Sequence, residues 1–217
     1  MFRQMKVAVI GMTALTAASA HAQSLNIDMN TTGLVPTPVY MAAAGQAGTW
    51  NSFGGGVATP LLGLNGLASG VTISSVGTAN YSSTTLGYTG DLANLLNDVL
   101  DSPTSVTLGN LAAGQYNIYT YATDPDVPAT AGTIVTINGI SQTIIGPAVV
   151  AGNLIQGTHY ALHSVNHAGG NLTINLADAP GNQAFWNLNG IQVVLVPGPG
   201  SLAFFGLGML GMRRRRR

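Results

Sequence analysis

The sequence has no cysteine and no glutamate, and only 6% of its 217 residues are charged. The missing cysteine excludes disulfide bridges, Cys-ligated zinc or iron–sulfur centres and a thiol nucleophile. The low charge contrasts with about 25% in an average soluble domain. A chain of this length has room for one medium-sized domain in addition to targeting segments.

Basic residues are missing from the whole central part of the chain. The seven Lys and Arg residues lie only at the two ends: Arg3, Lys6, Arg213, Arg214, Arg215, Arg216 and Arg217. The seven acids all lie between those ends: Asp28, Asp91, Asp98, Asp101, Asp124, Asp126 and Asp178. The segment 23–212 therefore carries seven negative charges and no Lys or Arg. Neutralising phosphate requires Lys or Arg, so we expect no nucleic-acid partner and no attraction of this segment to anionic lipid.

The N-terminus has the pattern of a signal peptide over residues 1–22. Two basic residues precede a short apolar stretch over 7–15, and Ala20 and Ala22 fit the small-x-small rule for cleavage. Cleavage there makes Gln23 the first mature residue. The alternative is a buried N-terminal helix. Export also agrees with the missing thiols, because such a chain is indifferent to an oxidising compartment.

The C-terminus, residues 197–217, combines a helix breaker, an apolar segment and a cationic stop. The breaker is the motif Val196, Pro197, Gly198 and Pro199, because proline disfavours helix before it. The apolar segment 201–212 is followed directly by the five arginines, which are costly in hydrocarbon and stop translocation. As a helix, 201–212 spans only ~18 Å of a ~30 Å bilayer core. We therefore expect a transmembrane helix that is held weakly and temporarily.

These three parts, in this order at the end of the chain, resemble the PEP-CTERM sorting signal of Gram-negative bacteria. Gly198 stands where that signal usually has Glu. The resemblance implies recognition by an exosortase, cleavage near the Pro motif, and export through the inner membrane to the cell surface or the extracellular polysaccharide matrix of a biofilm. The alternative is an ordinary C-terminal membrane anchor.

The body, residues 23–196, consists of short apolar or alternating runs separated by turn-forming residues. The runs are 67–75, 105–108, 114–122, 133–137, 140–145, 158–165, 171–176 and 190–196. Asn-Gly pairs at 65–66 and 138–139 are hairpin signals. In the run 114–122, alternation places Tyr116 and Ile118 on one face and Tyr119 and Tyr121 on the other. This pattern predicts an all-β fold, an antiparallel β-sandwich.

One segment departs from this pattern. Residues 91–100 carry leucines and a valine at helical spacing, with Asp91 placed to cap the N-terminus. We expect a short helix packed over one end of the sandwich. The alternative is a loop with buried leucines.

Short motifs in the body resemble those of galactose-binding-like jelly rolls. They are the Gly-x-Tyr-x-hydrophobic-Tyr strand at 114–119, the Asn-Gly hairpin at 134–139, two strands at 170–174 and 186–193, and an opening motif at 49–51. The resemblance implies a jelly-roll fold. Most members of that superfamily bind carbohydrate and some do not, so the fold alone does not decide the function.

Two tryptophans are the leading candidates for sugar binding, because an aromatic ring can stack on a sugar face. Trp50 lies beside a glycine-rich stretch, and Trp186 lies beside an apolar strand. The alternative for both is packing in the core, which we favour for Trp186.

Metal binding has two candidates. Asp124 and Asp126 flank a proline after a predicted strand, and two close carboxylates suit a structural Ca²⁺ ion, the alternative being a plain turn. His159, His163 and His167 recur every four residues. On a strand, the first two lie ~13 Å apart, too far to share an ion. We therefore expect exposed histidines there rather than a zinc site.

Catalysis has little support in the sequence. No Gly-x-Ser-x-Gly motif is present, and the body lacks Lys and Glu, which removes many acid–base designs. The sequence therefore predicts a non-catalytic surface or matrix protein without a cofactor. Two alternatives stay open: a carbohydrate-binding module that uses exposed aromatic residues, and a polysaccharide hydrolase with an unrecognised site.

Overall fold

The computed structural model describes residues 23–30, 34–77, 80–124, 126, 132–145, 152–180 and 186–197. The predicted signal peptide with Ala20 and Ala22, and the predicted tail from Gly198 and Pro199 through the five arginines, lie outside the described residues. Within the described part of the chain, no helix is long and apolar enough to cross a membrane.

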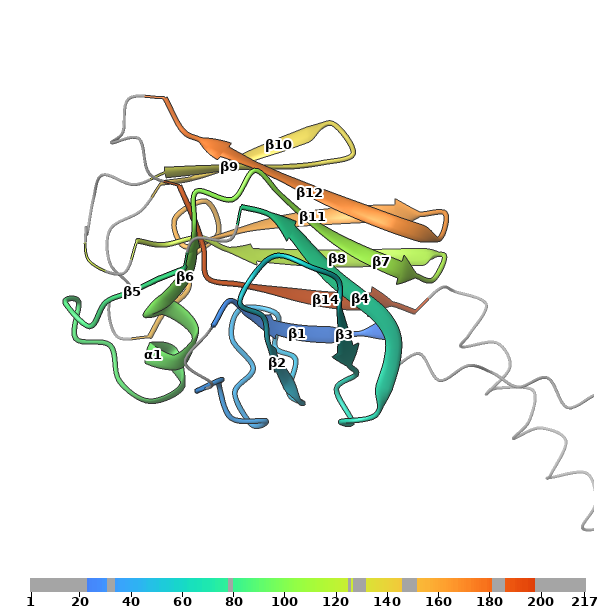
Figure 1. Ribbon diagram of the computed structural model, residues 1–217, viewed down its shortest axis with the longest axis horizontal. Helices are drawn as coiled ribbons and strands as arrows, with labels where there is room; N and C mark the ends of the chain where they lie inside the picture. Colours follow the sequence, from blue (N-terminus) through green and yellow to red (C-terminus); the bar gives the residue numbers. More distant parts are fainter. Residues whose placement is uncertain are drawn as a thin grey trace, which may run out of the picture.

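Two β-sheets face each other and form the body, as the sequence predicted (Figure 1). The five-stranded sheet has the order β11-β8-β14-β1-β2, and the six-stranded sheet has the order β10-β9-β12-β7-β4-β3. Neighbouring strands are antiparallel except β1 and β2, which are parallel. The strands of the two sheets are β1 (Leu25–Asp28), β2 (Trp50–Ser52), β3 (Thr59–Leu62), β4 (Ala68–Val76), β7 (Ser105–Leu111), β8 (Gly114–Tyr121), β9 (Gly132–Ile137), β10 (Ile140–Ile145), β11 (Tyr160–His167), β12 (Gly170–Asp178) and β14 (Gly190–Val196).

A small third sheet and the helix cover one end of this sandwich. The sheet has the order β13-β6-β5, with β5 (Asn80–Ser82), β6 (Asp98–Asp101) and β13 (Asn187–Leu188). The helix α1 (Gly90–Leu96) is confirmed, but it is shorter than predicted. The expected last turn is strand β6 instead, because residues 98–101 pair with both β5 and β13. The N-cap is Thr89 rather than Asp91, and the Asp91 carboxylate accepts hydrogen bonds from Thr37 instead.

The main core lies between the two large sheets and follows from the alternation of the strands. In β8, Tyr116 and Ile118 are fully buried in this core, as the pattern predicted, and Thr120 is fully buried as well. The β9–β10 hairpin turns at Asn138 and Gly139, whose positive φ angles of 50° and 78° are those that an Asn-Gly turn adopts. Apolar residues on the inner faces of both sheets thus fix the pairing register.

The two ends of the described chain leave the sandwich at the same end. Leu25 in β1 lies opposite Val193 in β14, and Val196 lies opposite Gln115 at the start of β8. We call this the termini end. At the opposite end of the same sheet, four residues are successive Cα partners across β1, β14, β8 and β11: Asp28, Gly190, Tyr121 and Tyr160. We call this the distal end, and α1 lies there (Figure 1).

Candidate functional site: a groove lined by tyrosine

The outer face of the five-stranded sheet carries a second apolar cluster, separate from the main core. Four of its residues are buried: Trp50, Leu95, Leu96 and Tyr121. Half-buried side chains from α1, β8 and β11 and from the connections that contain Tyr40, Tyr88 and Leu154 surround them. Four of these side chains are tyrosines: Tyr40, Tyr88, Tyr119 and Tyr160. Tyrosine dominates this cluster, so the outer face is aromatic and also bears hydroxyl groups.

The structure corrects the prediction that Trp50 is an exposed sugar-stacking ring. Trp50 is only 5% exposed, and its indole N–H donates to the carbonyl oxygen of Tyr40 at 3.2 Å. The sequence suggested a glycine-rich loop, but Trp50 begins β2, which pairs with β1 beneath the loop that contains Tyr40. A ring covered in this way has no free face for a ligand.

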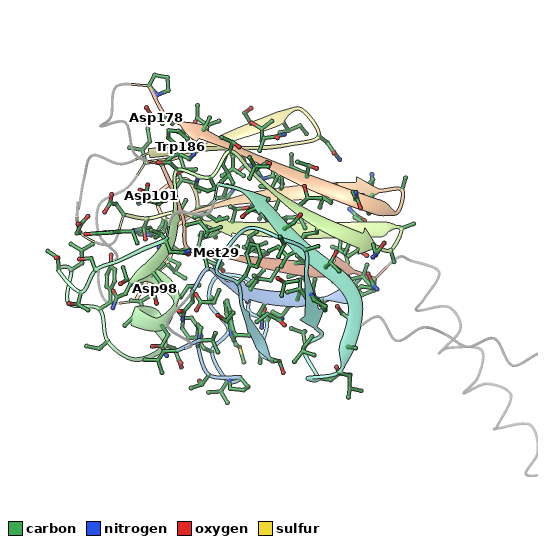
Figure 2. The ribbon with its side chains drawn as sticks, in the orientation of Figure 1. Met29, Asp98, Asp101, Asp178 and Trp186 are labelled. Carbon is green, nitrogen blue, oxygen red and sulfur yellow. The ribbon has the colours of Figure 1, made fainter. Side chains whose placement is uncertain are left out.

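Trp186 packs against the core, which was the interpretation favoured for it from the sequence. Its ring is half-buried against the main core, and its indole N–H donates to the carbonyl oxygen of Pro103 at 2.7 Å. The side chain lies beside Asp101 on the distal side of the molecule (Figure 2).

Buried amides hold the loop 38–48 against the sheet. The Gln46 side-chain nitrogen donates to the Asn26 side-chain oxygen at 2.8 Å and to the Leu25 carbonyl at 3.2 Å. The Gln192 side-chain nitrogen donates to the same Asn26 oxygen at 2.9 Å, and the Gln192 oxygen accepts from the Tyr121 hydroxyl at 2.5 Å. Burial raises the pKa of Tyr121, so its hydroxyl keeps the proton that it donates. A satisfied buried network of this kind makes the loop rigid.

This rigid loop forms one wall of an open groove. Residues Val39–Ala43 line one side, Gly152–Leu154 line the other, and the groove has a volume of about 590 Å³. Tyr40 and Leu154 belong to the same cluster as Tyr119 and Tyr160. The rings of Tyr119 and Tyr160 lie 5.6 Å apart between centroids, tilted by 37°. The groove therefore adjoins a continuous, partly exposed aromatic surface.

Two tyrosines of this surface, Tyr40 and Tyr160, keep their protons at physiological pH. Burial and, to a lesser extent, the nearby Asp91 carboxylate raise the pKa of Tyr40 to about 12. Burial and the neighbouring Tyr119 raise the pKa of Tyr160 as well. The hydroxyl groups therefore serve as hydrogen-bond donors and acceptors without charge.

Asp124 and Asp126 do lie together, at the distal end. The backbone N–H of Asp126 donates to Asp124 Oδ1 at 2.9 Å, and the Asn187 amide donates to Asp124 Oδ2 at 3.2 Å. The Tyr81 hydroxyl donates to Asp126. Hydrogen bonding with Asp124 and then with Tyr81 lowers the pKa of Asp126. In the described ranges no group of three or more His, Asp or Glu side chains is placed to hold a metal ion, and the calcium site stays a prediction.

The expectation of exposed histidines is wrong for His159 and His163, which are each 3% exposed. His163 points from β11 between the sheets, where its Nε2 lies 3.2 Å from the Ile140 carbonyl oxygen of β10. His159 Nδ1 accepts from the Ile155 backbone N–H at 2.9 Å. Burial lowers the pKa of His163. His163 and His159 thus join elements of the fold.

Sequence reasoning missed a buried carboxyl group at the distal end. Asp28 is fully buried, and its Oδ1 has no hydrogen-bond partner among the described residues. Burial, opposed by a hydrogen bond from Asn30 and assisted by the charge of Asp98, raises the pKa of Asp28 to about 8. Asp28 is therefore largely protonated at neutral pH. The sequence signal is weak, because Leu25, Asn26, Ile27 and Asp28 only alternate between apolar and polar residues.

Comparisons with known proteins find similarity at the level of solved structures alone. No family model matches the chain, and no curated protein matches it. Bacteroides uniformis β-glucuronidase 2 superposes with a TM-score of 0.45 and 16% identity, over 79% of this chain and 19% of that one. The chain thus spans about a fifth of that enzyme's length.

Two further solved structures superpose more loosely. The exo-β-1,3-galactanase of Phanerochaete chrysosporium gives a TM-score of 0.30 and 16% identity, over 64% of this chain and 29% of that one. The CBM36-1 domain of a multidomain xylanase from the Trinervitermes trinervoides hindgut metagenome gives 0.26 and 14%, over 67% and 90%. None of these superpositions assigns the chain to a family, so its function has to be inferred from its own residues.

Proposed function

We propose that this protein is a non-catalytic, polysaccharide-binding protein that acts outside the cell and uses the tyrosine-lined groove as its binding site. The observation that carries the proposal is the combination of a rigid open groove with an adjoining tyrosine surface. Tyrosine offers a sugar both a ring face for stacking and a hydroxyl for hydrogen bonds.

The charge of the chain favours a neutral polysaccharide. The body between the two basic ends has no Lys or Arg to neutralise a uronate or sulfate. Asp91 lies close enough to Tyr40 to raise its pKa, so the flank of the groove is negative. Like charge repels, and an anionic glycan is therefore disfavoured at this site.

The lining of the groove supports binding without turnover. Glycoside hydrolysis uses two placed carboxyl groups in most enzymes. The residues that line the groove are Val39, Tyr40, Met41, Ala42, Ala43, Gly152, Asn153 and Leu154, and none of them is acidic. The site therefore offers ring faces and hydrogen bonds but no acid–base pair.

Binding to neutral polysaccharides, measured by affinity electrophoresis and calorimetry, tests the proposal. Tyr160→Ala removes a ring of the surface and is expected to weaken binding about tenfold. Tyr81→Ala is the matched control, because Tyr81 is 44% exposed but lies outside the aromatic cluster. Equal loss in both variants, or no binding by the wild-type protein, contradicts the proposed function.

We also propose that the protein is exported and sorted by an exosortase, on the strength of its two end sequences. The support is the signal-peptide pattern that ends at Ala22 and the tail of Pro motif, apolar segment and arginines. The intact mass of the extracellular form tests this. A mass that starts at Gln23 and lacks the tail is expected, whereas a retained polyarginine end favours a plain anchor.

A further inference from the structure

The carboxylates of the described chain gather at the distal end. Asp28 is the last residue of β1, where its Cα partner is Gly190. Asp124 and Asp126 follow directly after β8, whose last residue is the Cα partner of the same glycine. These three acids therefore lie at the same end of the five-stranded sheet, the distal end.

The other four acids lie at this end as well. Asp178 ends β12, the strand that begins at the termini end with Gly170. Asp98 and Asp101 lie in β6, which pairs with β13 just before Gly190. Asp91 lies in α1, which contacts β6. Figure 2 shows Asp98, Asp101 and Asp178 on the side of the molecule that carries the helix.

The termini end has no carboxylate, lysine or arginine in its described residues. Three connections that lie there, 63–67, 112–113 and 168–169, contain only Gly, Ala, Leu and Asn. Beside the exit of the chain, a mostly apolar groove of about 530 Å³ includes Ser24, Leu64 and Pro197 in its lining. The described residues where the chain enters and leaves thus include no acidic side chain, Lys or Arg, whereas the acidic side chains lie at the distal end.

We propose that the termini end, which lacks acidic side chains, faces the lipid bilayer while the tail is inserted, and that the tyrosine groove on the outer face of the five-stranded sheet stays clear of the membrane. The proposal rests on the proposed export and tail insertion. It needs no attraction between the body and lipid, because the tail supplies the attachment. The carboxylates other than the protonated Asp28 supply the orientation, since an anionic lipid surface repels them.

The sandwich is longer than the range of the electrostatic field at a lipid surface, so the upright orientation can be strongly favoured. A strand of nine residues such as β12 is ~30 Å long. The Debye length is ~10 Å at 0.1 M salt. Carboxylates at the distal end of an upright sandwich therefore lie beyond the field of the surface. Tilting the body toward the surface brings them into it, and each charge within that field lowers the population about fivefold.

Single-cysteine labelling tests the orientation cleanly, because the chain has no native cysteine. Leu67→Cys places a fluorophore in the 63–67 turn at the termini end, where Leu67 is 67% exposed. Thr85→Cys places one in the exposed loop between β5 and α1. The chain from Gln23 with its tail is bound to vesicles of phosphatidylcholine and phosphatidylglycerol that carry a headgroup quencher.

We expect strong quenching of the Leu67→Cys label and little quenching of the Thr85→Cys label. The contrast should shrink in 1 M salt, where the Debye length falls to ~3 Å. Equal quenching of both labels on anionic vesicles, or stronger quenching of the Thr85→Cys label, overturns the proposal.

A charge variant isolates the electrostatic cause. Ala113 and Ala168 are exposed in the termini-end connections. The double variant Ala113→Asp, Ala168→Asp should reduce the contrast between the labels, and the matched Ala113→Ser, Ala168→Ser variant should preserve it. An identical contrast in both double variants overturns the electrostatic orientation.

Vesicle flotation separates the possible failures. A chain that still floats with the vesicles in 1 M salt, where attachment by the arginines alone is screened, but shows equal quenching at low salt overturns the orientation and leaves the tail insertion standing. A chain that does not float overturns the insertion, and the orientation with it. Polysaccharide binding by the vesicle-bound chain should match that of the free chain. A groove that is blocked on the vesicle contradicts the outward orientation.

Discussion

The buried carboxyl group of Asp28 gives the most specific quantitative prediction. Its pKa is raised to about 8 in the folded protein, against an ordinary value of 3.8. The sign follows from linkage: as the pH rises from 4 to 8, the unfolded chain releases this proton and the folded chain retains it. As far as Asp28 is concerned, the free energy of unfolding is therefore highest below pH 4 and falls as the pH rises to 8.

The size of the effect follows from the same shift. One pKa unit corresponds to about 1.4 kcal/mol, so the free energy of unfolding should fall by about 1.4 kcal/mol per pH unit across this window. The total loss is on the order of 5 kcal/mol. Asp28→Asn has nearly the same shape and cannot ionise. It should abolish this pH dependence and be more stable than the wild-type protein at pH 8.

Urea unfolding at pH 5, 6, 7 and 8 measures the difference between wild type and Asp28→Asn directly. Asp126→Asn is a control that should show no such pH dependence over this range, because the pKa of Asp126 is lowered from 3.8 and its contribution is lost only below about pH 4. If the free energies of wild type and Asp28→Asn stay parallel across this range, the reasoning about Asp28 is refuted.

Two further predictions concern the contacts beneath the groove. A Cβ atom at Gly190 would lie 2.7 Å from Leu95 Cδ1 and 2.8 Å from the Ile27 carbonyl oxygen. Gly190→Ala should therefore lower stability by about 1–3 kcal/mol in thermal unfolding, and an unchanged melting temperature contradicts this close approach. Gln192→Leu removes the partner of the Tyr121 hydroxyl and should cost about 1–3 kcal/mol. It should also expose the loop 38–48 to thermolysin in limited proteolysis, and unchanged cleavage would show that the amide network does not hold the loop.

Local signals explain why several strands could be predicted from the sequence. The run 114–122 alternates in residue type, and the structure buries Tyr116 and Ile118 while it turns Tyr119 and Tyr121 to the other face. The Asn138-Gly139 pair specifies its hairpin turn without outside help. In these places local chemistry and the fold agree.

Long-range pairing explains where sequence reasoning failed. Helical spacing continues through Leu100, yet residues 98–101 form β6 because β5 and β13 lie on either side of them. Trp50 lies in a three-residue strand whose partner, β1, begins at Leu25. Neither partner can be recognised from nearby residues, so propensity alone misplaces both segments.

For the candidate site, the sequence predicted the type of side chain but not the residues that form it. Aromatic side chains were expected to bind sugar, but the tryptophans are covered, and the tyrosines form the surface instead. Tyr40, Tyr119 and Tyr160 come from a loop and two strands that are far apart in the sequence. Only the sheet topology brings them together, and the buried amides of Gln46 and Gln192 set the wall of the groove.

The most direct test of the central claim is an NMR titration of the mature protein with a neutral oligosaccharide. We expect backbone amide shifts to change at Val39–Ala43, at 152–154 and around Tyr119 and Tyr160, and the same titration of Tyr160→Ala to need about ten times more oligosaccharide. Shift changes confined to another face of the sandwich, or the same midpoint in Tyr160→Ala, would contradict this.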